Sequence, residues 1–122
     1  MADPKNLSER LENFAVEIIR IGQILDKTFV GRKLSGQLIS ASTSAGANYE
    51  EACGAESLSD FIHKLQIVLK ELRESLYWLR LVSKIELIPT GKLYPAVQEG
   101  NELENIISKS IVTARKNKKV KE

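Results

Sequence analysis

The sequence predicts an all-α protein, an antiparallel up-down-up-down four-helix bundle. Four segments place apolar residues at steps of three or four, the spacing that gives a helix one apolar face. Short breakers separate these segments, and none of them has the alternation and turn chemistry of a strand. Connections of a few residues favour helices that pack against their neighbours in the chain, which gives the antiparallel arrangement.

Size and composition predict a single domain over residues 1–122. Hydrophobic residues make up 43% of the chain and charged residues 28%, a balance typical of globular proteins rather than disordered ones. The formal net charge of +2 excludes a highly basic nucleic-acid wrapper and an acidic solvating chain. The chain has one cysteine, no apolar signal core and no apolar run of about 20 residues, so we expect a cytoplasmic protein with no membrane partner.

The first helix is expected over residues 7–29. Asn6 followed by Glu9 has the spacing of a capping box at its start, and Gly31 is expected to end it. Its apolar stripe consists of Leu7, Leu11, Phe14, Ile18, Ile21, Leu25 and Phe29.

The second helix, residues 33–55, is unusual because its middle is made almost entirely of Ser, Thr, Ala and Gly. Gly36 and Gly46 each disfavour a helix by about 1 kcal/mol relative to alanine, so a low-complexity loop is the alternative. The apolar faces of the other segments need a partner surface, however, and small side chains let helix backbones approach closely. We therefore expect a rigid helix packed by the other three, with a stripe of Leu34, Leu38, Ala41, Ala45, Tyr49 and Ala52.

The third and fourth helices are expected over residues 58–86 and 92–117. Ser57 with Asp60 resembles a capping box before the third helix, and Pro89 follows its end. Its stripe runs for about seven turns through Leu58, Phe61, Leu65, Val68, Leu69, Leu72, Leu76, Leu79 and Val82. Pro95 and Gly100 obscure the start of the fourth helix, whose inward residues are Leu103, Ile106, Ile107, Ile111 and Ala114.

A second apolar patch lies on the third helix, opposite its core stripe. It consists of Ile67, Trp78 and Leu81. A helix that is apolar on two sides is either buried on both or contacts another chain, and tryptophan is enriched at interfaces. We therefore expect these residues to line a homo-oligomer interface. The alternative is that the tryptophan lies on the surface without contacting a partner.

The positive charge is concentrated at the C-terminus. Residues 115–121 hold five of the 18 basic residues and no acidic one, whereas residues 1–114 carry 13 basic against 15 acidic residues. This basic tail, residues 115–122, is either a solvated helix end or a phosphate-binding segment. Its candidates for nucleic-acid contact are Arg115, Lys116, Lys118, Lys119 and Lys121.

The sequence shows no constellation of catalytic, cofactor-binding or metal-binding residues. The single histidine, His63, cannot supply a bundle di-iron site, and Cys53 has no C-x-x-C partner. Phosphate-loop, dinucleotide-binding and nucleophile-elbow motifs are all missing. We therefore expect a protein that is not an enzyme, without a cofactor or a small-molecule substrate. Polar side chains near the second connection are expected instead to bond neighbouring helices in a structural polar seam of Asn48, Glu51, Ser57 and Asp60.

Two stretches resemble a known family, the bacterial four helix bundle proteins first noticed as reading frames inside intervening sequences of 23S ribosomal RNA genes. The first is Ser44-Ala45-Gly46-Ala47-Asn48-Tyr49-Glu50-Glu51-Ala52-Cys53, followed by Ser57 and Asp60-Phe61. The second is Lys70-Glu71-Leu72-Arg73-Glu74-Ser75-Leu76-Tyr77-Trp78-Leu79. Many family members have Gly-Arg after the glutamate, where this chain has Gly54-Ala55.

The resemblance implies an antiparallel bundle, a ring-like homo-oligomer that is pentameric in several relatives, and no established enzymatic activity. Related accessory proteins of diversity-generating retroelements bind nucleic acid. We therefore expect a non-enzymatic, self-assembling interaction protein. The alternative is a nucleic-acid-binding accessory protein that uses the basic tail and an oligomer surface.

Overall fold

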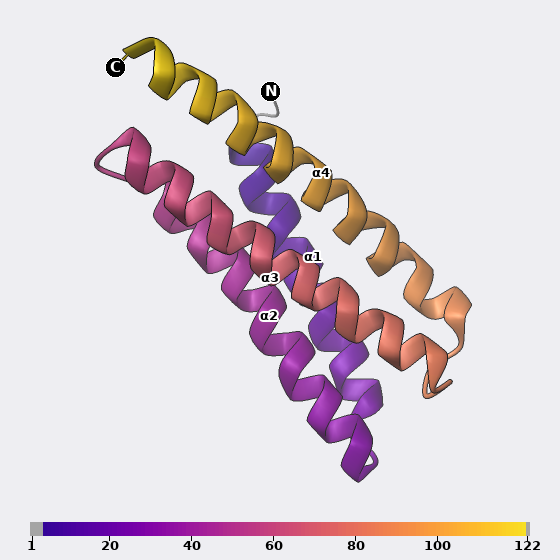
Figure 1. Cartoon of the computed structure of the whole chain (residues 1–122). Coiled ribbons are helices and arrows are strands. Elements are labelled where there is room, and N and C mark those ends of the chain that lie inside the picture. Colours follow the sequence, from indigo (N-terminus) through magenta and orange to yellow (C-terminus); the bar gives the residue numbers. More distant parts are fainter. Residues whose placement is uncertain (1–3, 122) are drawn as a thin grey trace.

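The computed structural model describes residues 4–121, with side chains for residues 6–120, as four antiparallel helices (Figure 1). They are α1 (Pro4–Leu25), α2 (Phe29–Cys53), α3 (Leu58–Lys84) and α4 (Thr90–Lys121). No strand is present within this part of the chain. The all-α bundle expected from the sequence is therefore confirmed.

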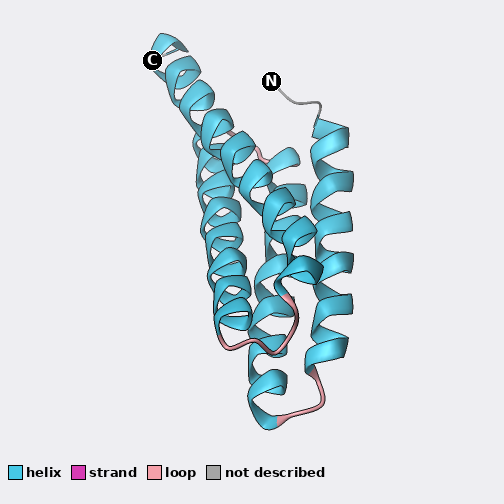
Figure 2. Cartoon of the chain, turned by 90° about the vertical axis from the view of Figure 1, so that its right-hand side faces the viewer, coloured by secondary structure: helices cyan, strands magenta, loops and turns pink. Residues whose placement is uncertain are grey.

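The four helices do not contact one another equally. Helix α2 packs against α1 and α3, and α3 packs against α4, whereas α1 and α4 share a much smaller contact. Figure 2 shows α4 leaning away from α1 toward its C-terminal end. Helices α2 and α4 lie on the diagonal and do not meet, so the small-residue helix is held by two neighbours and not by the three that the sequence had led us to expect.

One hydrophobic core runs through the bundle, and all four helices contribute buried side chains to it. The stripes expected on α1 and α3 supply most of it, including the fully buried Leu11, Ile18, Leu65 and Leu72. The small residues of α2 form a continuous helix whose Ala41, Ala45 and Ala52 are buried, as their spacing predicted.

The first connection differs from the expected one, because α1 ends at Leu25 and α2 already begins at Phe29. Thr28 caps α2, its side chain accepting a hydrogen bond of 2.9 Å from the Gly31 N–H. Gly31 therefore lies in the first turn of α2 instead of ending α1. Phe29, counted in the core stripe of the first helix, is 68% exposed.

Helix α1 begins at Pro4, earlier than the expected start at residue 7. Proline suits the first helical position because its missing N–H would have no partner in the helix there. Asn6 consequently lies inside α1, and the capping box expected from Asn6 and Glu9 does not mark the start of the helix.

Helix α3 ends at Lys84, two residues before the expected boundary. The N–H of Ile85 donates to the Leu81 carbonyl and that of Glu86 to the Ser83 carbonyl, which closes the last turn. Glu86 follows with φ of 59°, a left-handed conformation that ends the helix.

Helix α4 is longer than expected at both ends, running from Thr90 to Lys121 instead of over residues 92–117. Pro95 lies inside it, in the second turn. Its missing N–H deprives the carbonyl of Gly91 of a helical partner, but Gly91 is exposed and water can donate there. The basic segment expected to form a tail is thus the final part of a 32-residue helix.

Candidate functional site

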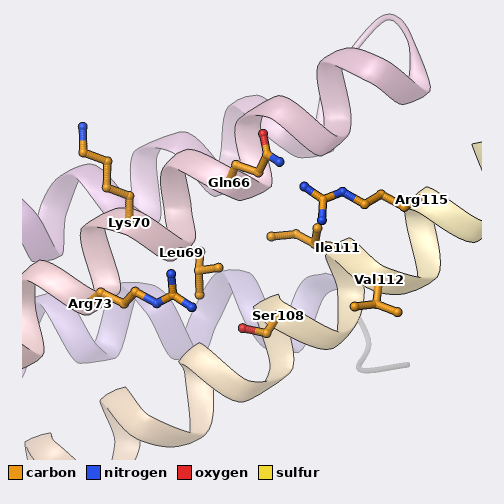
Figure 3. Close-up of a pocket in the computed structure, with 8 residues that line it drawn as sticks. All are labelled: Gln66, Leu69, Lys70, Arg73, Ser108, Ile111, Val112 and Arg115. Atoms are coloured by element: carbon orange, nitrogen blue, oxygen red, sulfur yellow. The ribbon is translucent and has the colours of Figure 1, made fainter.

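A groove lies between the N-terminal half of α3 and the C-terminal half of α4 (Figure 3), and we call it the α3–α4 groove. Its volume is about 510 Å³. Helix α3 contributes Gln66, Leu69, Lys70 and Arg73, and α4 contributes Ser108, Ile111, Val112 and Arg115. The floor is apolar, and the polar side chains come from both helices.

The charges of the α3–α4 groove are all positive. The Nε of Arg73 donates to Glu104 on α4 at 3.1 Å, so this pair ties the two helices together at one end of the groove. Arg115 forms no ion pair with any described residue, and Figure 3 shows its side chain directed along the groove toward Gln66 and Ile111. Lys70 extends from α3 away from α4, on the outer rim. The charged side chains that line the groove therefore suit an anion better than a cation.

The basic residues predicted at the C-terminus lie on an exposed helix and do not converge on one point. Arg115, Lys116 and Lys119 are exposed, Lys118 is half-buried, and the side chain of Lys121 lies outside the described residues. Arg115 and Lys119 are four residues apart and share a ridge with Val112, at the edge of the groove. Between Asn105 and Lys121, α4 has six Lys or Arg residues and no Asp or Glu.

The residues predicted for self-association, Ile67, Trp78 and Leu81, are all half-buried on α3. Trp78 packs partly against the core, and its indole N–H donates to Glu74 at 3.3 Å. The Tyr77 ring meets Trp78 edge to face, with the ring centroids 5.0 Å apart. This flank of α3 thus presents a rigid, partly exposed aromatic and aliphatic surface.

Further apolar side chains gather at the end of the bundle that carries the first and third connections. The large exposed hydrophobic residues at this end come from α1, α2, α4 and the connection after α3: Ile24, Phe29, Val30, Ile85, Leu87 and Tyr94. The basic residues from Arg115 to Lys119 lie at the opposite end (Figure 1). The two ends of the molecule therefore differ in surface chemistry.

The polar seam expected between helices does not form among the residues whose side chains the structure describes. Asn48 is half-buried, but its side-chain amide donates to the carbonyl and hydroxyl oxygens of Ser44, one turn earlier in the same helix. Glu51 is exposed and makes no hydrogen bond or ion pair with the described residues. Ser57 caps α3 by accepting from the Asp60 N–H at 3.0 Å, as the capping-box spacing predicted.

The polar contacts that do join helices were missed from the sequence. Arg10 on α1 pairs with Glu99 and Glu102 on α4, and Ser8 donates a hydrogen bond to Glu50 on α2. The hydrogen bond with Glu99 raises the pKa of Arg10 further above its usual value. Partners 89 residues apart, such as Arg10 and Glu99, share no local spacing that could reveal them.

The described residues supply no metal centre and no bilayer-crossing helix. Within residues 4–121, no three His, Cys, Asp or Glu side chains lie close enough together to hold a metal ion. His63 and Cys53 are both exposed. None of the helices of this part of the chain combines the length and apolarity that a membrane crossing requires.

Two comparisons with known proteins found matches. Residues 6–109 match the family model of the 23S rRNA-intervening sequence protein. The fold is similar to the crystal structure of a protein with unknown function from the S23 ribosomal protein family of Bacteroides thetaiotaomicron, at 34% identity and a TM-score of 0.80, covering 86% of this chain and 97% of that one. No curated protein matches the chain.

Proposed function

This chain belongs to the 23S rRNA-intervening sequence protein family, and we propose that it is a non-enzymatic interaction protein that assembles with further copies of itself. Its place of action under this proposal is the cytoplasm. The observation that supports self-assembly best is the partly exposed flank of α3 formed by Ile67, Trp78 and Leu81.

The chemistry of this flank is that of an interface. Trp78 is held in one orientation by its hydrogen bond to Glu74 and by the edge of Tyr77, so little side-chain entropy is lost when a partner covers it. Large rigid aromatic residues surrounded by aliphatic ones are typical of the residues that contribute most to association. A ring of five copies, as the resemblance implies, is the proposed assembly.

Light scattering coupled to size exclusion tests the proposal at micromolar concentration. We expect a mass of several chains for the native protein and a smaller mass for Leu81→Glu. The matched control is Val16→Glu, which places the same charge on an exposed apolar position of α1. A native protein that elutes as a monomer would overturn self-assembly.

Trp78 provides a second readout, because it is the only tryptophan of the chain. Dilution that separates the copies is expected to expose the indole and shift its emission to longer wavelength. An assembly that dissociates without any change in this emission would place the interface elsewhere.

A second candidate function is nucleic-acid binding, and the observation that favours it is the carboxylate-free, cationic C-terminal part of α4. Such a helix face contacts phosphates without reading sequence, so binding should weaken steeply with salt. Retention of the full chain on immobilised RNA and DNA at low and high salt, compared with a chain truncated after Ala114, tests it. Equal retention of the two chains at low salt would exclude the basic segment as the nucleic-acid-binding site.

A further inference from the structure

We infer that the α3–α4 groove binds the sugar-phosphate backbone of a single nucleic-acid strand. This inference rests on the second proposed function and gives it a site. The main contact with the nucleic acid is then made by a groove between two helices and not by the C-terminal segment alone. Helix α3 supplies half of the residues that line this groove.

The lining of the groove has the chemistry of a phosphate site. Its polar side chains, those of Gln66, Lys70, Arg73, Ser108 and Arg115, all carry N–H or O–H donors, and none of the lining residues is acidic. Glu104 engages the Nε of Arg73, which leaves the other guanidinium donors for a ligand. In Figure 3 the polar ends of Arg73 and Ser108 approach each other from opposite helices. An anion between them can therefore be held from both sides.

The extent of the groove indicates a polymer and not a free phosphate. Gln66 and Arg73 on α3, like Ser108 and Arg115 on α4, are seven residues apart, which is about 10 Å along a helix. The positive charge does not stop at the groove, because Lys119 continues the ridge of Arg115 one turn further along α4. A chain of phosphates can follow this track, whereas a single phosphate would use only part of it.

The remaining lining residues indicate backbone contact without base recognition. Leu69, Ile111 and Val112 form an apolar floor, and no aromatic side chain among the lining residues offers a surface on which bases could stack. A space between two packed helices admits a single strand more readily than a wider duplex. We therefore expect little dependence on sequence.

The groove and the self-association flank occupy different faces of α3. Gln66 and Ile67 are consecutive, so the faces that they represent are turned by about 100° around the helix. Copies that assemble through Ile67, Trp78 and Leu81 would leave the groove open along each subunit. Binding to a strand and self-assembly are thus compatible.

Fluorescence anisotropy with a labelled oligouridylate of 20 or so nucleotides tests the inference on the full chain. Gln66→Glu introduces a carboxylate without changing side-chain size, and Arg115→Gln removes a positive charge. Each is expected to lower affinity by about fivefold or more at low salt. If Arg73, Arg115 and Lys119 each contact one phosphate, the double-logarithmic salt plot of the native protein should have a slope of about −2.

Matched controls separate the groove from the overall charge. Gln37→Glu makes the same change as Gln66→Glu on an exposed position of α2, and Lys116→Gln removes a charge next to Arg115 on another side of α4. Both should change affinity by less than about twofold. Circular dichroism verifies that every variant keeps its helices.

The outcomes distinguish this inference from the function on which it rests. No binding of the native protein to RNA or DNA overturns both. Two results would overturn the groove as the binding site and leave the basic segment in its place. One is that Lys116→Gln weakens binding as much as Arg115→Gln does, and the other is that Gln66→Glu does not weaken binding. Tighter binding to a duplex, or full competition by polyglutamate at equal charge, overturns the single strand as the occupant.

Discussion

Arg10 on α1 holds Glu99 on α4 with two parallel hydrogen bonds, from Nε to Oε2 at 3.0 Å and from Nη2 to Oε1 at 2.7 Å. The same Nη2 lies 3.0 Å from Glu102. Because α1 and α4 share little other contact, this cluster is the main polar link between the first and last helices. The paired side chains of Arg10 and Glu99 are about one third exposed, at 29% and 31%, so water partly screens the attraction.

Removing this link should loosen α4. Arg10→Ala is expected to lower the free energy of unfolding by about 1 kcal/mol, because a forked, charge-assisted pair is lost and two carboxylates are left close together. Urea denaturation measures the change. Arg20→Ala, on an exposed position of the same helix, is the control and should have little effect. Equal stability of the native protein and Arg10→Ala would contradict a role for the pair.

Glu17 should make stability depend on pH. Burial, with the nearby charge of Glu99, raises the pKa of Glu17, so its ionisation is less favourable in the folded than in the unfolded chain. Stability is therefore lost as the pH rises through the ordinary carboxyl range toward and past this raised pKa. Glu17→Gln should be more stable than the native protein at neutral pH, and the difference should vanish in acid. Thermal melts across the acidic range check this, with the exposed Glu12→Gln as control.

Two glycines of α2 should respond in opposite directions to alanine. A Cβ at Gly31 would lie 1.9 Å from the Leu25 carbonyl oxygen, a backbone atom that cannot move without breaking the α1–α2 connection. Gly31→Ala should destabilise the protein by more than about 2 kcal/mol. Gly36 has no atom within 4 Å of a built Cβ, so Gly36→Ala should stabilise by about 0.5–1 kcal/mol. Denaturant midpoints that move the same way for both would contradict this packing.

Glu86 is the described non-glycine residue with a positive φ, 59°. A left-handed conformation costs a residue with a Cβ about 1 kcal/mol, and glycine adopts it freely. Glu86→Gly should therefore raise the free energy of unfolding by roughly 0.5–1 kcal/mol. Glu86→Ala removes the same charge but keeps the Cβ. If Glu86→Ala raised the free energy of unfolding by a similar amount, the loss of charge and not the backbone conformation would be responsible.

The helices and their buried faces could be predicted because they depend on local periodicity. The stripe from Leu7 to Leu25 and the one from Leu65 to Val82 needed only steps of three or four. The helix ends were harder to predict. The sequence predicts Gly31 as a terminator because glycine commonly follows helices. In the structure, glycine is required there by the close approach to Leu25, which only the folded chain creates.

The candidate site was predicted in part. The run of basic residues from Arg115 is visible in the sequence, but the α3 side of the groove is not, since Gln66, Lys70 and Arg73 form an ordinary polar helix face until α4 packs beside them. The polarity of Asn48 and Glu51 predicts hydrogen bonds between helices. Asn48 instead satisfies its amide within α2, a local option that asparagine always has.

The diagonal separation of α2 and α4 has a consequence for the order in which the protein opens. Helix α4 is anchored mainly through α3, with a smaller contact to α1, whereas α2 is enclosed between α1 and α3. Undocking α4 would leave the α1–α2 and α2–α3 seams intact, so such partial unfolding should require less free energy than global unfolding. Amide hydrogens of α4 would then exchange with solvent before those of the small-residue helix, and proteases would find their first cleavage sites there.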